Sequence, residues 1–491
     1  MSASFFFYDL ETSGTNPREA RIMQFAGQRT DMDLHPVGDP VNLLVRLTPD
    51  VVPDPDAVLL TGITPQSTLA DGLTEKEFLE EFYRTVVQPD TIFLGFNTVR
   101  FDDEFMRFLL YRNFYDAYEW QWQDGCSRWD LLDVVRMTRA LRPEGIEWPF
   151  TAEGAPTNRL ELLTKLNGLD HDQAHDALSD VHATIAVARL IRDKQPKLFS
   201  YLLDLRSKKA VRPIIESGEV FTYSSGKYPK ETHHTTAAVF LAQQPGESNR
   251  DCLLVYDLRH DPTPFLGMSV DELVGAWTWK RDRKPDDLKL PVKTVKLNRC
   301  PAVTPGFPKD SDIQQRLQLN EQTTTKHLRI LQANQAGFVE KLLQALSKMN
   351  ESQSARFAEM PADCDGQLYE ALIGNNDKTI LRAIRAAKPE QIDDYKDDLR
   401  DMRLRHLLPR YKARNYPASL TDDERREWDA LCYHRLMDGN DDSRLGRYFK
   451  RLGELAERSD LSDSQRYLLE ELQLYGESIV PAYDDSDDIG T

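Results

Sequence analysis

The stretch Phe5-Phe6-Phe7-Tyr8-Asp9-Leu10-Glu11-Thr12 opens the chain with four aromatic residues followed by two carboxylates. The aromatic run predicts a buried strand, and residues i and i+2 of a strand point to one face. Ionised carboxylates on a buried strand are costly unless a cation compensates them, so Asp9 and Glu11 are candidate metal ligands. A solvated strand end is the alternative, because the chain carries 80 Asp and Glu residues.

Two further motifs place acidic residues beside apolar elements. Asp102 follows the strand-like run 91–96 and begins a helical pattern, so it is a candidate ligand or, alternatively, a helix N-cap. His175 and Asp180 lie at the start of a helix that continues through residue 190, and both can reach one cleft. A capping or surface role for each of the two is the alternative.

The composition limits the class of protein. The chain has 491 residues, is 40% hydrophobic and 29% charged, and has a net charge of −18, which is typical of a soluble protein of about two to four domains. An acidic balance argues against a protein that simply coats nucleic acid. There is no long apolar run and no signal peptide, so we expect a cytoplasmic protein without a membrane segment. The five cysteines form no C-x-x-C pair, which excludes a disulfide framework and a thiolate zinc site.

The hydrophobic pattern changes along the chain. Up to residue 197, strand-like runs alternate with helical stretches, which predicts an α/β fold. Between residues 198 and 350 short β runs (237–241, 252–258 and 292–297) indicate a small β-rich module with a linker. Residues 201–300 carry a local charge of +3. Residues 351–480 have helical spacing, and residues 481–491 are an acidic tail that we expect to be disordered.

The three motifs together resemble the DEDDh branch of the 3′→5′ exonucleases, which have a ribonuclease-H-like core. Longer stretches resemble the bacterial exonuclease I family, densely at 97–104, 111–116, 127–134 and 141–146, and more thinly at 291–293, 298–301 and 410–417. This resemblance implies a ribonuclease-H-like exonuclease domain over 1–197. It implies an SH3-like β module with linker over 198–350 and an α-helical domain over 351–480.

The resemblance also implies an activity. Members of this family hydrolyse single-stranded DNA processively from its 3′ end, release 5′-mononucleotides, and act in DNA repair and recombination. The implied cofactor is a pair of Mg²⁺ ions, with Mn²⁺ able to substitute, and hard oxygen ligands suit both ions. The implied metal ligands are Asp9, Glu11, Asp102 and Asp180. His175 is the implied general base, a role that suits an imidazole titrating near neutral pH.

The resemblance assigns contacts to the DNA and to a partner protein. The implied substrate contacts are Glu11, Arg107, Tyr118, Trp122, Arg136, Arg159, Asp251, Lys293 and Leu297. At position 251 the family tends to have a neutral polar residue, so an aspartate departs from the pattern. Arg142 and Tyr201 match a pocket for the acidic C-terminal tail of single-stranded-DNA-binding protein, although the pocket residues near 305–310 are not recognisable. A monomer is expected.

Aromatic residues are concentrated between positions 115 and 122. Tyr115, Tyr118, Trp120 and Trp122 fall within these eight residues, and a core position is expected for most of them. We expect Tyr118 and Trp122 at the surface, where aromatic rings stack on bases without sequence preference.

Two other functions are alternatives to a single-strand-specific exonuclease. One is a shorter type of DEDDh nuclease that acts on RNA ends or in proofreading, although its core needs only about 200 residues. The other is a non-catalytic scaffold that binds single strands. The intact set of acids and His175 argues against the scaffold.

Overall fold

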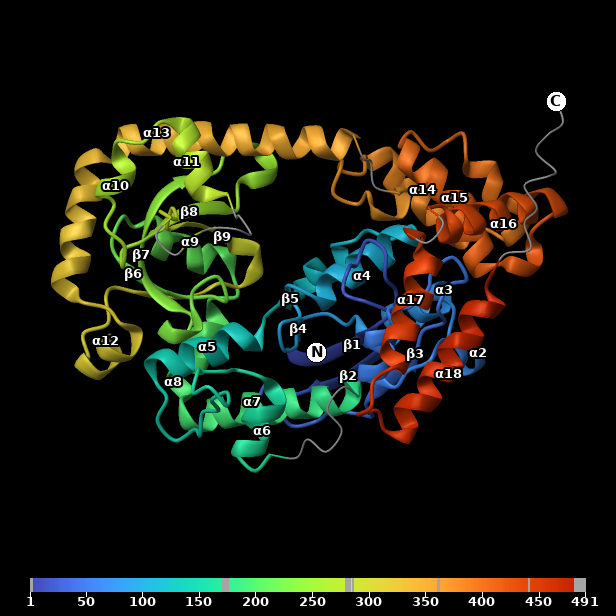
Figure 1. Cartoon of the computed structure of the whole chain (residues 1–491), viewed down its shortest axis with the longest axis horizontal. Coiled ribbons are helices and arrows are strands. Elements are labelled where there is room, and N and C mark those ends of the chain that lie inside the picture. The colour runs from blue at the N-terminus through green and yellow to red at the C-terminus, as the bar shows by residue number, and fades with distance from the viewer. Residues whose placement is uncertain are drawn as a thin grey trace.

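The structure is a computed structural model that describes residues 3–169, 176–278, 284, 287–359, 363–439 and 442–480, with only the backbone described for 355–359. Figure 1 shows three parts arranged around an open outline, with the long helix α13 running up the left side and along the top. The first part is an α/β unit, the second a small β module, and the third a group of helices. Among the described residues, no helix is long and apolar enough to span a membrane.

A five-stranded mixed sheet forms the centre of the first part. Its order is β3-β2-β1-β4-β5, with β2 antiparallel to β1 and β3, and β4 parallel to β1 and β5. The strands are β1 (Ser4–Thr12), β2 (Ile22–Thr30), β3 (Val41–Leu44), β4 (Thr91–Leu94) and β5 (Ser127–Arg128).

The aromatic residues of β1 supply both layers of the core. Phe5 and Phe7 pack on one face of the sheet, whereas Phe6 and Tyr8 pack on the other. All four are at most 3% exposed, because β1 is the central strand and helices cover both of its faces. The predicted buried strand is therefore confirmed, and it ends at the two acidic residues.

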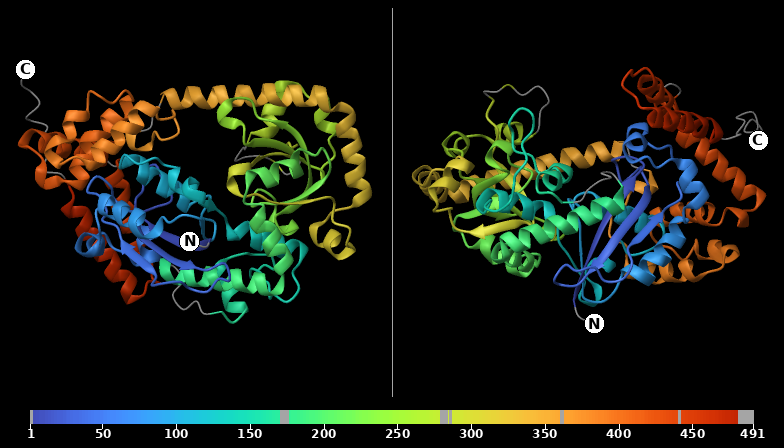
Figure 2. Two further views of the ribbon diagram at one scale, coloured as in Figure 1. Left: turned by 180° about the vertical axis from the view of Figure 1, so that it is seen from behind. Right: turned by 90° about the horizontal axis from the view of Figure 1, so that it is seen from below.

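Among the described residues, nine α-helices belong to this part of the chain or link it to the module. They are α1 (Pro55–Thr61), α2 (Pro65–Asp71), α3 (Glu75–Glu81), α4 (Asp102–Arg112), α5 (Leu131–Leu141), α6 (Leu160–Leu166), α7 (Ala177–Lys194), α8 (Pro196–Asp204) and α9 (Lys208–Glu216). Helix α7 packs along β1 and β2, as the view from below in Figure 2 shows. Helices α3 and α4 contribute apolar residues to the opposite face.

The second part is built on an antiparallel sheet of order β10-β6-β7-β8-β9. The strands are β6 (Phe221–Ser224), β7 (Thr235–Gln243), β8 (Cys252–Asp257), β9 (Val292–Lys296) and β10 (Ala302–Pro305), and the helices are α10 (Thr263–Leu266), α11 (Val270–Trp277) and α12 (Ser311–Leu317). The three predicted β runs correspond to β7, β8 and β9. The sequence pattern missed β6 and β10, which are only four residues long.

Helix α13 (Glu321–Glu359) connects the module to the third part. The third part contains α14 (Asn375–Ala386), α15 (Met402–Asn415), α16 (Asp422–Met437), α17 (Arg444–Ala456) and α18 (Asp463–Ser478), as its helical spacing predicted. Helix α18 returns to the first part and packs on α1 and α2. The C-terminal helices therefore hold the α/β unit directly.

Candidate active site

Asp9 and Glu11 lie at the end of β1 and are brought next to Asp180 of α7. One ligand atom from each of these three residues lies within 4.8 Å of the others. Asp9 pairs with Ala26 and Glu11 with Gln24 in the sheet register, and the β-ladder becomes irregular directly after Glu11. Glu11 is only 9% exposed, so the alternative of a solvated strand end is wrong for this residue.

Asp102 joins this group through the backbone of β1. It is the first residue of α4, and its Oδ1 accepts a hydrogen bond of 3.1 Å from the amide of Leu10, which lies between Asp9 and Glu11. The N-cap residue is Phe101, and no side chain caps the helix. The N-cap alternative for Asp102 is therefore wrong, because its carboxylate points to the strand.

The start of α7 is fixed by its N-cap and by a side chain from β2. Asp176 caps the helix, and its Oδ2 accepts a hydrogen bond of 3.0 Å from the amide of Ser179. Gln24 contacts both Asp176 (Nε2–Oδ1 3.3 Å) and the amide of Ala177 (N–Oε1 3.4 Å). This double contact places Asp180, one turn into the helix, over the end of β1. His175 lies outside the described residues.

The carboxylates are buried together, and this raises their pKa values. Burial raises the pKa of Glu11 to about 9, with further contributions from the charges of Asp9, Asp180 and Asp176. Burial also raises the pKa of Asp9, helped by Asp180 and Asp176, and that of Asp102, helped by Asp9. In the metal-free protein these acids therefore favour protonation, and a bound cation would favour their ionised form.

This donor set fits a hard divalent cation. The ligand atoms are carboxylate oxygens only, which suit Mg²⁺ or Mn²⁺ better than soft metals. A second acidic group, formed by Asp363, Cys364 and Asp365, does not fit as well. Its carboxylates are already paired with Arg410 (2.5 Å) and Arg414 (2.5 Å), so they have partners without a metal.

A cavity of about 610 Å³ opens beside the carboxylates and is lined by Asp9, Asp180, Arg136 and Arg159. Arg136 is held by Asp133, with Nη1 and Oδ1 2.6 Å apart. The Arg159 side chain is largely exposed. Two of the arginines that were predicted to contact DNA therefore line the same space as two of the acidic residues.

Arg107, Tyr118 and Trp122 lie on and after α4. The Arg107 guanidinium lies over the Tyr118 ring at 5.4 Å from its centroid, and Arg107 also donates to Gln121 (3.1 Å). Trp122 is 64% exposed, whereas Trp120 is 1% exposed and packs in the core. The expected surface position is therefore correct for Trp122, while Tyr118 is half-buried.

The three candidate contacts on the β module differ in accessibility. Lys293 is half-buried on β9, but the Leu297 side chain is fully buried in the core. Asp251 is held by Lys208 (2.6 Å) and Arg212 (3.2 Å). Burial opposes ionisation of Asp251, but these two cations lower its pKa overall. Asp251 is therefore an ionised partner of the adjacent helix.

A group of cations lies where the module faces the first part, and of these only Lys293 was named as a DNA contact from the sequence. Burial lowers the pKa of Lys227 to about 8, and the nearby charges of Arg100, Lys296, Lys293 and Arg299 contribute. Arg100 lies between β4 and α4, and Lys227 lies in the turn after β6. Lys293 and Lys296 lie on β9, and Arg299 lies in the turn that follows it. For Lys227, Lys296 and Arg299 the only signal in the sequence was the +3 charge of residues 201–300, which does not identify the residues.

Arg142 and Tyr201, the two candidate partner contacts, lie near the edge of the β module. Arg142 lines a cavity of about 570 Å³ with residues 304–310, and Tyr201 lies beside Thr304. The segment 305–310, which the sequence did not identify as a pocket, is thus part of the wall. Lys309 adds a second cation there.

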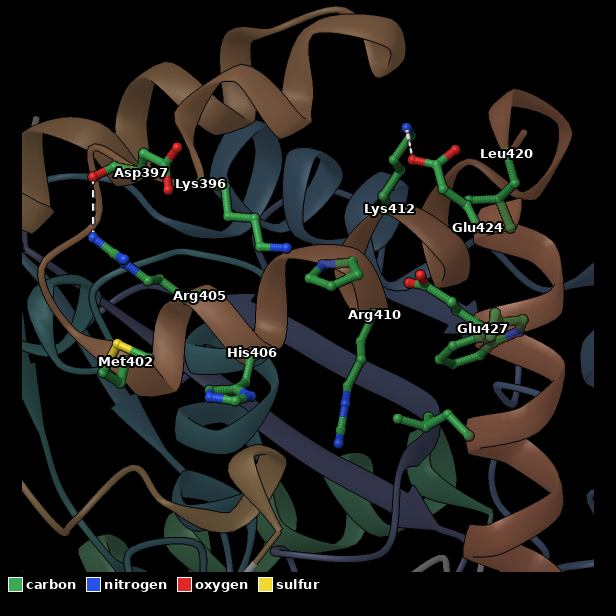
Figure 3. A pocket seen from close by; sticks show the side chains of 13 residues that line it. Lys396, Asp397, Met402, Arg405, His406, Arg410, Lys412, Leu420, Glu424 and Glu427 are labelled. Atoms are coloured by element: carbon green, nitrogen blue, oxygen red, sulfur yellow. Dashed lines mark hydrogen bonds and ion pairs between the residues drawn. The ribbon is translucent and has the colours of Figure 1, made fainter. Parts of the chain in front are cut away.

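A further cavity of about 390 Å³ lies in the third part, between α15 and α16 (Figure 3). Several of its charged residues already have partners within the domain. Lys412 pairs with Asp393 (2.5 Å) and Glu424, and Arg405 donates to the carbonyl of Asp397 (3.1 Å). None of the candidate catalytic residues lines this cavity, so we assign it no catalytic role.

Comparison with known families covers almost the whole chain. Family models match in the same order as the three parts: "Exonuclease" at residues 6–188, "Exonuclease I SH3-like domain" at 206–348 and "Exonuclease I C-terminal domain" at 362–479. The expected architecture of an exonuclease domain, an SH3-like module and a helical C-terminal domain is confirmed.

The curated relatives described next share the name exodeoxyribonuclease I. Exodeoxyribonuclease I of Haemophilus influenzae is 37% identical over 437 residues, which cover 88% of this chain and 90% of that protein. Exodeoxyribonuclease I of Escherichia coli is 38% identical over 436 residues, covering 87% of this chain and 88% of that protein.

Solved structures agree with the curated relatives. The chain is similar to E. coli exonuclease I in complex with a dA16 oligonucleotide and to the zinc-bound form of the E. coli enzyme with single-stranded DNA. Each comparison has a TM-score of 0.90 at 35% identity and covers 98% of this chain and 100% of that chain. A structure of SSB/exonuclease I with the inhibitor CFAM has a TM-score of 0.87 at 34% identity, with the same coverage. The chain is therefore a nuclease and belongs to the exodeoxyribonuclease I family.

Proposed function

We propose that this protein removes 5′-mononucleotides from the 3′ end of single-stranded DNA, processively, with two divalent ions held by Asp9, Glu11, Asp102 and Asp180. The observation that carries the proposal is the buried group of carboxylates at the end of β1, whose pKa values are raised by burial and by one another. A group of this kind is unfavourable in the folded protein unless it binds cations, so its presence supports a metal-dependent reaction.

Magnesium is the proposed ion, with manganese able to substitute, because both prefer carboxylate oxygens. When bound, two such ions stabilise the charge that develops on the attacking and leaving oxygens of a phosphodiester. The protein's own contribution is to hold the four carboxylates in place. Asp102 is fixed by the amide of Leu10, and Asp180 by the capped start of α7.

His175 is the proposed general base, which accepts the proton of the attacking water. A neutral imidazole suits this role because its ordinary pKa lies near neutral pH. The neighbouring Asp176 is the N-cap of α7, and Asp180 of the same helix belongs to the group of carboxylates. We expect His175→Ala to reduce turnover far more than metal affinity. Near-normal hydrolysis with normal metal dependence would contradict the assignment.

Single-stranded substrate is favoured because the candidate contacts are arginines and exposed rings. Arg136 and Arg159 line the cavity beside the carboxylates and can pair with phosphates, whereas Trp122 exposes its ring to solvent. Stacking requires unpaired bases, so a duplex cannot use it. Similarity to exonuclease I over 87% of the chain or more disfavours the shorter type of nuclease.

One experiment tests the proposal against its rivals. Nucleotide release from a 3′-ended single strand is measured with Mg²⁺ and with EDTA, and the same assay is repeated on duplex DNA and on RNA. We expect Mg²⁺-dependent release of 5′-mononucleotides from single-stranded DNA only. Preferential release from RNA would indicate the other nuclease class, and binding without release in Mg²⁺ would indicate a scaffold.

The proposal includes a partner, the acidic tail of single-stranded-DNA-binding protein. Arg142 and Lys309 supply two cations for an acidic ligand in the cavity next to Tyr201, and Glu144 and Asp310 line the same cavity. The proposed state is a monomer in the cytoplasm, the compartment of the DNA substrate. Deleting the tail of the binding protein should weaken the complex in a titration, and unchanged affinity would count against this pocket. Sedimentation would test the monomer.

A further inference from the structure

Three consecutive carboxylates at the start of α4 have three different sets of partners. Asp102 faces β1, as described above. Asp103 is buried and accepts a hydrogen bond of 2.6 Å from the Tyr8 hydroxyl and another from Arg128. Glu104 points away from the sheet, and its partners come from all three parts of the chain.

The Glu104 carboxylate contacts one residue from each part. Within its own domain, Oε1 lies 2.8 Å from Nη1 of Arg107. The same oxygen lies 3.1 Å from Nη2 of Arg299, in the turn Leu297–Arg299 of the β module. The other oxygen, Oε2, accepts a hydrogen bond from the hydroxyl of Tyr369, which precedes α14 in the C-terminal domain.

A second bond fastens the same turn of the module. Arg128, at the end of β5, donates to Asp103 and also to the carbonyl of Asn298 (2.6 Å). The module is thus bound twice to the region where α4 begins. Asp103 and Glu104, which make these contacts, lie within two residues of Asp102. The joint between the domains, which Glu104 forms with Arg107, Arg299 and Tyr369, therefore shares one short segment with the candidate catalytic centre.

The burial and charge of this joint favour a role beyond packing. The Glu104 side chain is 13% exposed and Arg107 is 8% exposed, whereas Arg299 is 34% exposed and Tyr369 is 47% exposed. Two guanidinium groups face the Glu104 carboxylate, and Arg107 also lies 3.7 Å from Asp103, so the contacts form one network of charged hydrogen bonds. The pairing also fixes Arg107 against the Tyr118 ring.

We propose that Glu104 is a positioning residue that joins the three domains around the bound strand and thereby sets how many nucleotides are removed in each binding event. This inference rests on the proposed exonuclease function. On this proposal the strand is released when the domains separate, whereas hydrolysis depends on the carboxylates of β1 and α7. Loss of the joint should therefore shorten each run of hydrolysis more than it slows a single cleavage.

Arg299→Gln is the first test, because it breaks the joint on the module side and leaves the Glu104–Arg107 pair intact. Run length is measured on a long single strand with a heparin trap, and kcat at saturating DNA in the same buffer. We expect the run length to fall about tenfold, the scale of losing one partly buried charge pair, with kcat changed less than twofold. Arg299→Lys should recover part of the run length, because it keeps the charge. Tyr369→Phe, which keeps the ring, should also shorten the runs.

A double-mutant cycle separates this joint from a direct DNA contact. Glu104→Gln should raise KM and shorten the runs, and adding Arg299→Gln should then shorten them little further, because the pair is already broken. Full additivity would instead assign Arg299 directly to a phosphate and overturn the proposal. Equal losses of kcat and run length would also overturn it.

A control comes from another pair between the first and third parts, the two parts that the Glu104–Tyr369 contact also joins. Asp56 of α1 and Arg451 of α17 form a two-bond ion pair (2.7 and 2.8 Å) at a different part of the interface. Asp56→Asn should leave the run length unchanged. An equal effect of Asp56→Asn would mean that general loosening, and not Glu104, controls the run length. Failure of the proposed function itself looks different, because the wild-type protein would then release no nucleotides.

Discussion

The amide of Leu10 donates a hydrogen bond to the carboxylate of Asp102, 92 residues further along the chain. This bond ties the start of α4 to the strand between Asp9 and Glu11. Parallel pairing of β1 with β4, in which Phe7 faces Leu94, brings the two segments to the same edge of the sheet. The acidic site is therefore assembled by the sheet register, and each acid is held by a different element.

The mutual repulsion of the acids gives a prediction for stability. Asp9→Asn should raise the free energy of unfolding of the metal-free protein by about 1 kcal/mol, because a neutral amide replaces a carboxyl group whose ionisation is opposed by burial and by Asp180. Thermal denaturation in EDTA and in Mg²⁺ measures this. Mg²⁺ should stabilise the wild type but not the variant, and hydrolysis by the variant should fall by at least about 10³-fold.

Asp39→Asn is the matched control, since Asp39 is an exposed acid in the same domain. It should change neither the metal-free stability nor the effect of Mg²⁺. If Asp9→Asn destabilised the metal-free protein instead, the acids would not repel one another in the folded state.

The contacts of Gln24 give a second prediction. Gln24→Ala removes the side chain that holds both Asp176 and the amide of Ala177. We expect hydrolysis to fall about tenfold, because a displaced helix start misplaces Asp180, while stability falls by about 1–2 kcal/mol. Hydrolysis rates and urea unfolding provide the two measurements.

Gln28→Ala is a suitable control for this variant. Gln28 lies on the same strand, is also buried, and donates to the carbonyls of Arg29 (2.9 Å) and Gly38 (3.2 Å). Its loss should cost similar stability without a specific loss of hydrolysis. If the two variants lost hydrolysis equally, Gln24 would have no positioning role.

The catalytic candidates could be predicted because each sits beside a strong local signal. The aromatic run before Asp9 and the apolar strand before Asp102 are visible in any reading of the sequence. The supporting residues could not be predicted in this way. Gln24 reaches α7 only because the register pairs it with Glu11, and Glu104 meets Arg299 only after the module has docked. The expected domain boundaries and the role of His175 stay predictions.

The burial of neighbouring aromatic residues is also difficult to predict from the local sequence. Trp120 and Trp122 are two positions apart, yet one is buried against Tyr8, Phe82 and Phe93 and the other is exposed. Their short 3₁₀ turns lack the regular period that would reveal a buried face. The expected surface position was correct for Trp122, but Tyr118, which was also expected at the surface, is half-buried.

These two tryptophans give a third prediction with an internal control. Trp122→Ala should weaken binding of single-stranded DNA by about 1–3 kcal/mol, the usual contribution of one stacked base, and leave stability unchanged. Trp120→Ala should instead cost about 3–5 kcal/mol of stability, because it empties a large buried volume. Fluorescence titration and urea unfolding distinguish the two. Unchanged DNA affinity of Trp122→Ala would remove Trp122 from the DNA path.

A buried charge network at the interface of the first and third parts gives the last prediction, on pH. Arg414 lies 2.6 Å from Asp50 and 2.5 Å from Asp365, and Arg435 contacts both acids. Burial by itself would raise the pKa of Asp50, but Arg414, Arg435 and Arg21 outweigh it, and the pKa is lowered overall. The pKa of Asp365 is lowered by the same three arginines.

The folded protein therefore binds fewer protons at Asp50 than the unfolded chain does below pH 4. Its contribution to stability is complete above the unfolded pKa of about 4 and is lost as the pH falls towards the lower folded pKa. We expect Asp50→Asn to cost about 3–5 kcal/mol at pH 7, because it leaves buried arginines without their partner, and to cost clearly less at pH 3. Urea unfolding at both pH values measures this difference.

Asp56→Asn, at the exposed pair with Arg451, should cost at most about 1 kcal/mol at pH 7. A cost of Asp50→Asn that does not change between pH 7 and pH 3 would contradict a lowered pKa, because acid should remove from the wild type the same interaction that the substitution removes.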